Sequence, residues 1–155
     1  SHSNDFYTVG SMGHASMIAL GISQNVKQKV ICIDGDGSSL MHLGNLTSLG
    51  LSNRKNLIHI ILNNSCHDSV GGQPTAAEHV NLYKFAENCG YKSYAKSEEK
   101  SKIQELFKEL LISDGPHFLE IAVKKGHRDD LGRPTSSPQE NKKKLMGSLG
   151  LIYDS

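Results

Sequence analysis

Long apolar runs, an excess of charge of one sign and a framework of paired cysteines are all missing from this 155-residue sequence. No apolar stretch approaches the roughly 18 residues that a membrane-spanning helix needs, and no signal-peptide pattern is visible. Lysine and arginine total 17 against 16 acidic residues, so nothing in the charge favours binding to nucleic acid or to a membrane. The three cysteines are widely spaced. This spacing predicts a protein of the reducing cytoplasm that has neither a disulfide framework nor a zinc site.

What the sequence does contain is an alternation of short apolar runs and helical patterns. Residues 29–33 and 57–62 are near-continuous apolar runs, which is typical of parallel strands covered on both faces. Residues 97–112 predict an amphipathic helix with Ser97 as its N-cap. Its apolar residues at helical spacing, all expected in the core, are Ile103, Leu106, Phe107, Leu110 and Leu111. The order predicts an α/β fold: a doubly wound, mainly parallel sheet with helices on both faces.

Further elements complete this pattern. Helices are predicted over residues 13–24, 43–52 and 81–89, and strands over 91–95 and 117–123. Residues 124–141 have little apolar content, which predicts a long loop or tail. We therefore expect residues 1–124 to form the α/β domain and residues 125–155 to form a C-terminal loop and tail that packs on it.

Two polar motifs follow two of the predicted strands. Gly35-Asp36-Gly37-Ser38 follows the first strand, and Asn63-Asn64 follows the second. Carboxyl ends of neighbouring strands form the edge where open α/β sheets bind ligands. Asp36 offers one charged oxygen and Asn64 a neutral one, and Mg²⁺ usually shares a few such oxygens with ligand phosphates.

The backbone around Asp36 suits an anion. Gly35 and Gly37 allow close approach because they have no Cβ, and Gly37 and Ser38 can direct N–H groups at phosphate from the start of a following helix. Asp-Gly and Asn-Asn pairs are also common in turns, so each motif alone favours a loop. A dinucleotide-binding interpretation is weaker, because Gly35-x-Gly37-x-x-Leu40 lacks the third glycine of that fingerprint.

The two motifs together resemble those of thiamine diphosphate (ThDP)-dependent enzymes, in which Gly-Asp-Gly precedes Asn-Asn by about this distance. The resemblance implies ThDP and Mg²⁺ as cofactors of residues 1–124. It implies that Asp36, the Asn64 side chain and the backbone carbonyl of Cys66 bind the metal. The residues that it places at the diphosphate are Gly35, Asp36, Gly37, Ser38 and Asn64.

Gly10-Ser11-Met12-Gly13 resembles a second motif of the same family. The resemblance implies that the carbonyl of Gly10 accepts a hydrogen bond from the aminopyrimidine of the cofactor. It also implies that Ser11 is a cofactor-binding residue and that Met12, two positions beyond Gly10, supports the bent shape of the cofactor. Without the flanking glycines, Met12 would be interpreted as an ordinary core methionine.

A narrower resemblance is to phosphonopyruvate decarboxylases. It is carried by residues 63–75 and 130–135 and by Pro138-x-Glu140-Asn141-Lys142. It implies conversion of 3-phosphonopyruvate, a small 2-oxo acid, into phosphonoacetaldehyde and carbon dioxide in phosphonate biosynthesis.

The same resemblance nominates residues near the substrate. His67 and Ser69 are the candidate catalytic residues, and Val70, Arg128 and Arg133 are the candidate substrate contacts. The alternatives are a surface histidine in a loop for His67 and a solvated basic tail for the two arginines.

One family feature is absent. The essential glutamate that contacts the pyrimidine of the cofactor belongs to a separate pyrimidine-binding domain, and no such domain is present in this sequence. We therefore expect a pyrimidine-binding domain or subunit as partner, within a homo- or hetero-oligomer, and no turnover by this chain alone. Two alternatives stay open: a sulfopyruvate decarboxylase β-type subunit, and a non-catalytic doubly wound domain that binds a nucleotide.

Overall fold

The computed structural model describes residues 4–151, and the chain divides into two compact units. The larger unit is Gly13–Gly126, and the other joins the N-terminal residues up to Met12 to the segment from His127 onward. Each unit is described by itself. The expected division into residues 1–124 and 125–155 stays a prediction, and its outermost residues, 1–3 and 152–155, lie outside the described part. No helix within residues 4–151 has the length and apolar character to cross a membrane.

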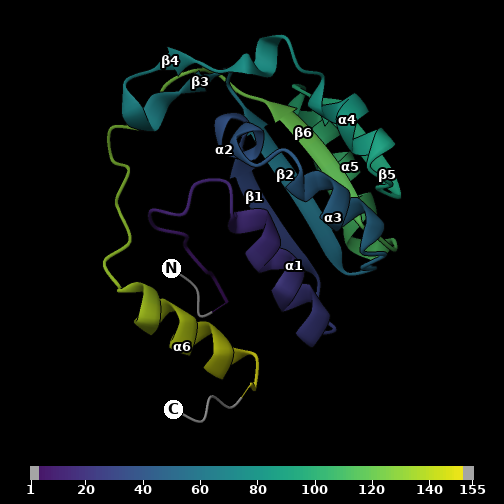
Figure 1. Ribbon diagram of the computed structural model, residues 1–155, viewed down its shortest axis with the longest axis vertical. Coiled ribbons are helices and arrows are strands. Elements are labelled where there is room, and N and C mark those ends of the chain that lie inside the picture. Colours follow the sequence, from purple (N-terminus) through teal and green to yellow (C-terminus); the bar gives the residue numbers. More distant parts are fainter. Residues whose placement is uncertain (1–3, 152–155) are drawn as a thin grey trace. The chain divides into compact units, whose positions relative to one another are not determined.

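The larger unit is built on a four-stranded sheet in which all neighbours are parallel. The order across the sheet is β1 (Val30–Gly35), β2 (Leu57–Asn63), β6 (His117–Ala122) and β5 (Ser93–Ser97), as Figure 1 shows. A separate two-stranded pair joins β3 (Cys66–His67) to β4 (Gln73–Pro74) in antiparallel fashion. The apolar run of β2 is buried because this strand lies inside the sheet.

Helices cover both faces of the sheet (Figure 1). On one face, α1 (Ala15–Asn25), α3 (Asn45–Leu51) and α4 (Leu82–Asn88) enclose a core that includes Leu46 and Phe118. On the other face, α5 (Lys100–Ile112) packs through Leu110 on a second core. The short helix α2 (Asp36–Met41) follows β1 directly, and the 3-10 turns η1 (Asp68–Val70) and η2 (Ala76–Glu78) follow β3 and β4. The expected doubly wound α/β fold is therefore confirmed.

Three local predictions are wrong. Helix α5 begins at Lys100 after Glu99, so Ser97 is not its N-cap and instead accepts a hydrogen bond from the Glu99 N–H in the preceding turn. Leu111 is 38% exposed because it lies beyond the apolar stripe that faces the sheet. The segment predicted as loop up to residue 141 already contains the start of α6 (Pro138–Ser148), whose N-terminus is fixed by a capping box between Ser137 and Glu140.

The edge strand β1 is covered on one face only. Cys32 is 4% exposed and packs beneath α1 and α3, whereas Ile31 and Ile33 are 40% and 62% exposed on the opposite face. Helix α5 packs over β2, β5 and β6 and leaves this part of β1 open. The prediction that both faces of this strand are covered is therefore wrong within the described chain.

The core of the larger unit contains one histidine with an unusual environment. His59 on β2 is 1% exposed, and its Nδ1 lies 3.0 Å from the hydroxyl of Tyr91. Burial lowers the pKa of His59 from 6.5 to about 4. The imidazole is therefore neutral in the folded protein at pH 7.

This burial predicts acid sensitivity. The unfolded chain binds a proton at His59 near pH 6.5, whereas the folded chain binds it only near pH 4. The contribution of neutral His59 to the free energy of unfolding is therefore fully present above about pH 6.5 and is lost as the pH falls towards 4. The difference corresponds to a loss of about 3 kcal/mol in the free energy of unfolding. In urea titrations across this range, His59→Phe should show a much shallower decline. The exposed His79, changed to Gln, should leave the decline as it is, and equal slopes in all three proteins would contradict the prediction.

Candidate functional site

The pairing of β1 with β2 brings the two polar motifs together. Gly35 is in register with Leu62, so Asp36 and Asn64 leave their strands at the same edge of the sheet. Asp36 is only 1% exposed, and its Oδ1 accepts a hydrogen bond from the Asn64 N–H at 3.4 Å. The two residues expected to bind a metal are thus in contact.

The second oxygen of the Asp36 carboxylate is held by a residue that the sequence did not nominate. Thr75 Oγ1 donates a hydrogen bond to Asp36 Oδ2 at 2.5 Å. The same hydroxyl accepts from the Ala77 N–H at 3.2 Å and so caps η2. Thr75 therefore fixes the carboxylate relative to the turn that follows β4.

The loop after β2 is organised by Asn64 and Asp68. Asn64 Oδ1 accepts from the Cys66 N–H at 3.1 Å, and Asn64 Nδ2 donates to Asp68 Oδ2 at 2.7 Å. Asp68 also accepts from the Gly126 N–H at 2.8 Å, so it connects this loop to the end of the unit. The Cys66 thiol donates to Asp68 at 3.0 Å, which raises the pKa of Cys66 and keeps the thiol protonated. Only the backbone carbonyl of Cys66 then fits the metal-binding role expected of it.

An ion pair between buried Glu120 and half-exposed Lys96 supports the same loop from the neighbouring strands. Glu120 on β6 is 1% exposed; its Oε1 accepts from Asn63 Nδ2 at 2.8 Å and lies 2.8 Å from Lys96 Nζ. Asn63 Oδ1 in turn accepts from the Ser65 N–H at 3.0 Å. Sequence reasoning missed Glu120, because its signal is only an acidic residue inside an apolar strand.

The predicted catalytic histidine lies against a predicted diphosphate-binding glycine. A Cβ on Gly37 would lie 2.5 Å from both Cε1 and Nδ1 of His67, so the imidazole rests directly on the Gly37 backbone. Gly35, by contrast, has no atom within 4 Å of the corresponding position. Ser69 and Val70 lie in the adjacent turn η1, where Val70 is 62% exposed. Glycine at position 37 thus permits the close approach of His67.

Ser38 connects the start of α2 to the start of α1. Its Oγ accepts a hydrogen bond from the Gly13 N–H at 2.8 Å. The Ser38 hydroxyl is therefore already engaged, and its backbone N–H is the group that suits an anion.

The remaining candidates belong to the other unit. Gly10 has φ +78, and Met12 beyond it is 41% exposed. Arg128 and Arg133 both line a cavity of about 740 Å³, together with polar groups that include Tyr7. The structure thus brings the two arginines together, while the roles expected for Gly10, Ser11 and Met12 stay predictions.

The residues of the larger unit fit a hard divalent cation. The Asp36 carboxylate, the Asn64 carboxamide and the Cys66 carbonyl all offer oxygen, which is the donor type that Mg²⁺ prefers. Asp36 and Asn64 are already in contact, and the open space at Gly35 leaves the backbone beside them accessible. The arrangement can therefore hold a metal ion against an anionic ligand at the carboxyl edge of the sheet.

An open parallel sheet with such a site at its carboxyl edge defines a ligand-binding domain of the doubly wound α/β class. Within this class, residues 2–121 match the family model described as the C-terminal TPP-binding domain of thiamine pyrophosphate enzymes. The chain belongs to this family.

Curated relatives show which enzymes resemble the chain. It is 38% identical to a phosphonopyruvate decarboxylase of Streptomyces viridochromogenes, over 87% of this chain and 34% of that protein. It is 32% identical to a sulfopyruvate decarboxylase subunit beta of Methanococcus maripaludis, over 94% of this chain and 77% of that protein. The chain thus spans about a third of the length of the first relative.

A solved structure shares the fold. The ThDP-dependent 4-hydroxybenzoylformate decarboxylase of Rhodococcus jostii RHA1 superimposes with a TM-score of 0.63 at 21% identity, over 74% of this chain and 24% of that one.

The contact between Gly37 and His67 yields a test. Gly37→Ala should displace the imidazole and lower the free energy of unfolding by about 1 kcal/mol, the lower end of the cost of overpacking, because a ring at the end of a side chain can move. Gly35→Ala is the matched control, since its Cβ meets nothing. Urea unfolding at pH 7 measures both. Equal stability of the two variants would show that His67 does not rest on Gly37.

Proposed function

We propose that the chain is the diphosphate- and metal-binding half of a ThDP-dependent 2-oxo acid decarboxylase. The substrate that we propose is 3-phosphonopyruvate, with phosphonoacetaldehyde and carbon dioxide as products. The observation that carries the proposal is the contact between buried Asp36 and Asn64 at the carboxyl edge of the sheet. The similarity to a phosphonopyruvate decarboxylase along 87% of the chain supports the choice of substrate.

The larger unit binds the anionic end of the cofactor. Asp36, Asn64 and the Cys66 carbonyl hold Mg²⁺, and the N–H groups of Gly37 and Ser38 face the diphosphate. Thr75 and Asp68 keep the carboxylate and the carboxamide in place through the hydrogen bonds described above. Bound ThDP supplies the nucleophilic carbon and the electron sink for decarboxylation, while the protein supplies position and electrostatics.

His67 is the proton-handling group on the substrate side. Its imidazole lies on Gly37, so it is adjacent to the diphosphate-binding backbone. An imidazole can act as a general acid, which suits delivery of a proton to the product carbon after carbon dioxide has left. Ser69 and Val70 follow in η1, and we assign them to the substrate side as well. Gly10, Ser11 and Met12 are the residues that we assign to the aminopyrimidine of the cofactor.

Arg133 is the residue that we assign to the phosphonate. Arg128 is already paired with Asp130, with Nε–Oδ1 and Nη2–Oδ2 distances of 2.9 and 3.2 Å. Arg133 lines the same cavity and has no ion pair among the described residues. A guanidinium fork matches the geometry of a phosphonate, so the unpaired arginine is the stronger anion ligand.

A partner completes the active site. Ile31, Ile33 and Leu62 expose apolar surface at the β1 side of the sheet, which supports packing against another protein surface. The partner that we propose is the pyrimidine-binding domain or subunit, in a homo- or hetero-oligomer located in the cytoplasm.

A second candidate function is that of a sulfopyruvate decarboxylase β-type subunit. It is favoured by 44% identity over 69% of the chain to the subunit beta from Methanocaldococcus jannaschii. Sulfonate and phosphonate are both tetrahedral anions, so Arg133 suits either. Comparison of the two substrates distinguishes these functions.

The cofactor assignment predicts metal-dependent binding. Isothermal titration of ThDP into the complex of chain and partner should show binding that requires Mg²⁺. Asp36→Ala should weaken it at least tenfold, because the only charged metal ligand is lost. Asp114→Ala, which removes a surface carboxylate paired with Lys55, should bind normally. Preference for an adenine nucleotide, insensitive to Asp36→Ala, would instead favour a non-catalytic nucleotide-binding domain.

The substrate assignment predicts the order of the substrates in a carbon dioxide release assay and the dependence of that release on Arg133. With ThDP, Mg²⁺ and the partner present, release should be faster from 3-phosphonopyruvate than from 3-sulfopyruvate or pyruvate. Arg133→Ala should raise the KM for 3-phosphonopyruvate about tenfold and leave the kcat for pyruvate unchanged, because pyruvate lacks the anionic tail. Arg128→Ala should have a smaller effect because Asp130 already neutralises Arg128. An unchanged KM in Arg133→Ala would remove Arg133 from the substrate site.

A further inference from the structure

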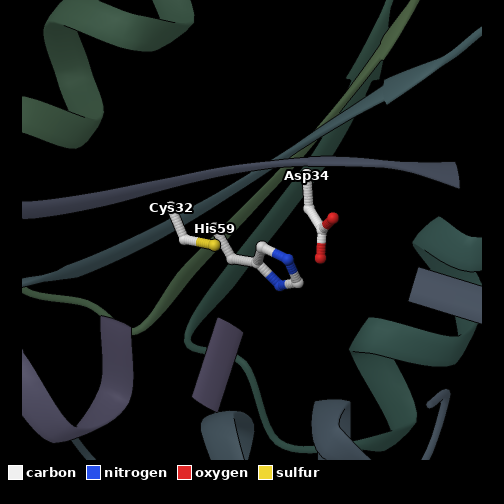
Figure 2. Close-up of side chains that lie close together, drawn as sticks. All are labelled: Cys32, Asp34 and His59. Carbon is white, nitrogen blue, oxygen red and sulfur yellow. The ribbon is translucent and has the colours of Figure 1, made fainter. Parts of the chain in front are cut away.

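A second group of metal-ligand side chains lies in the core of the larger unit. Cys32 and Asp34 alternate on β1, and His59 on β2 is in register with Cys32. One ligand atom from each residue lies within 4.8 Å of the other two. The three side chains project to the same side of the sheet (Figure 2) and are 4%, 8% and 1% exposed. None of them belongs to the ThDP site described above.

His59 offers a nitrogen without a partner. Its Nδ1 lies 3.0 Å from the Tyr91 hydroxyl, while its Nε2 is fully buried and has no hydrogen-bond partner in the described chain. A buried polar atom in this state costs free energy unless a ligand satisfies it. Histidines that bind metals commonly have their other nitrogen held by such a hydrogen bond, which orients the ring. His59 therefore has the arrangement expected of a metal ligand.

We propose that Cys32, Asp34 and His59 bind one Zn²⁺ ion, with Tyr91 as the residue that positions His59. Three protein ligands and one water give the four-coordinate geometry that Zn²⁺ favours. Thiolate and imidazole are ligands that select Zn²⁺ over Mg²⁺, so this site differs in metal from the all-oxygen site at Asp36.

Charge and proton balance are consistent with Zn²⁺. The Cys32 thiolate and the Asp34 carboxylate together neutralise the two charges of the ion, which limits the cost of placing it in the core. Zinc binds the thiolate form of cysteine, so the thiol proton of Cys32 leaves as the sulfur–zinc bond forms.

The distances require only a small adjustment. Ligand atoms around tetrahedral zinc lie roughly 3.5 Å apart at bond lengths of about 2.0–2.3 Å. The three atoms lie within 4.8 Å of one another, so the distance between any two of them would shorten by at most about 1.3 Å. The Asp34 carboxylate retains free lone pairs while it accepts from the Gly35 N–H at 3.0 Å.

The consequence of such a site is a cross-link between β1 and β2. These two strands carry Asp36 and Asn64 at their carboxyl ends, so zinc would fix the spacing on which the ThDP site depends. The cysteine spacing alone predicted no zinc site. Only one cysteine takes part in the proposed site. Asp34 is on the same strand and is of a residue type common in turns, and His59 is on the neighbouring strand, so the spacing of the cysteines could not indicate the site.

The test uses Co²⁺ in place of Zn²⁺ on the full chain, without ThDP. A Co²⁺–thiolate bond gives a charge-transfer absorption band, and we expect it to saturate at about one ion per chain. Zn²⁺ should abolish the band by competition, and an excess of Mg²⁺ should not. Cys32→Ser should remove the band, whereas Cys89→Ser, a buried thiol outside the group, should keep it. Tyr91→Phe should weaken Zn²⁺ binding about tenfold.

A measurement on the wild-type chain tests the proposal even where the variants fail to fold. Zn²⁺ should slow alkylation of Cys32 in partial urea at least tenfold, as followed by mass spectrometry, with Cys89 as the internal reference. The proposal is overturned by a folded wild-type chain with neither the band nor selective protection, or by a band that persists in folded Cys32→Ser. Because ThDP is absent, these outcomes do not depend on the proposed decarboxylase function.

Discussion

The parallel pairing of β1 with β2 is the constraint on which the chemistry of the larger unit depends. This register sets Gly35 beside Leu62, so that Asp36 and Asn64 meet immediately beyond the strand ends. A slip of one residue would exchange the faces of β1, placing Ile31 and Ile33 in the core and Cys32 outside it. The larger isoleucines would overpack the core beneath α1 and α3, and this opposes such a slip, although the site residues contribute little apolar burial themselves.

Hydrogen bonds over long sequence distances turn these strand ends into a defined site. Thr75 reaches Asp36 across 39 positions, and Glu120 reaches Asn63 across 57. Each contact satisfies a buried polar group, which would cost about 1–3 kcal/mol if it had no hydrogen-bond partner. The need to satisfy buried polar groups therefore fixes the loops as well as the core. The rigidity of the loop after β2 therefore comes from β6 and η2 rather than from the loop sequence alone.

The site residues could be predicted from the sequence where their role depends on their own segment, and could not be predicted where it depends on residues that are distant in sequence but close in space. Asp36 and Asn64 could be predicted because each directly follows an apolar strand, and parallel strands end at one edge. Thr75 and Glu120 could not, because nothing in their own segments specifies the partner that makes them part of the site. Leu111 was misplaced for the same reason: helical periodicity gives the direction of the apolar stripe, whereas the width of the buried stripe depends on the sheet that it meets.

Electrostatics makes the metal and the cofactor interdependent at this site. Asp36 is an almost fully buried carboxylate at the position where we propose that the diphosphate binds, and no lysine or arginine pairs with it in the described chain. Without a divalent cation, its charge would repel the diphosphate at low effective dielectric. With the cation in place, the same carboxylate becomes a source of affinity. If Mg²⁺ and ThDP share this site as proposed, each strengthens the binding of the other by the same factor, as linkage requires of two coupled ligands.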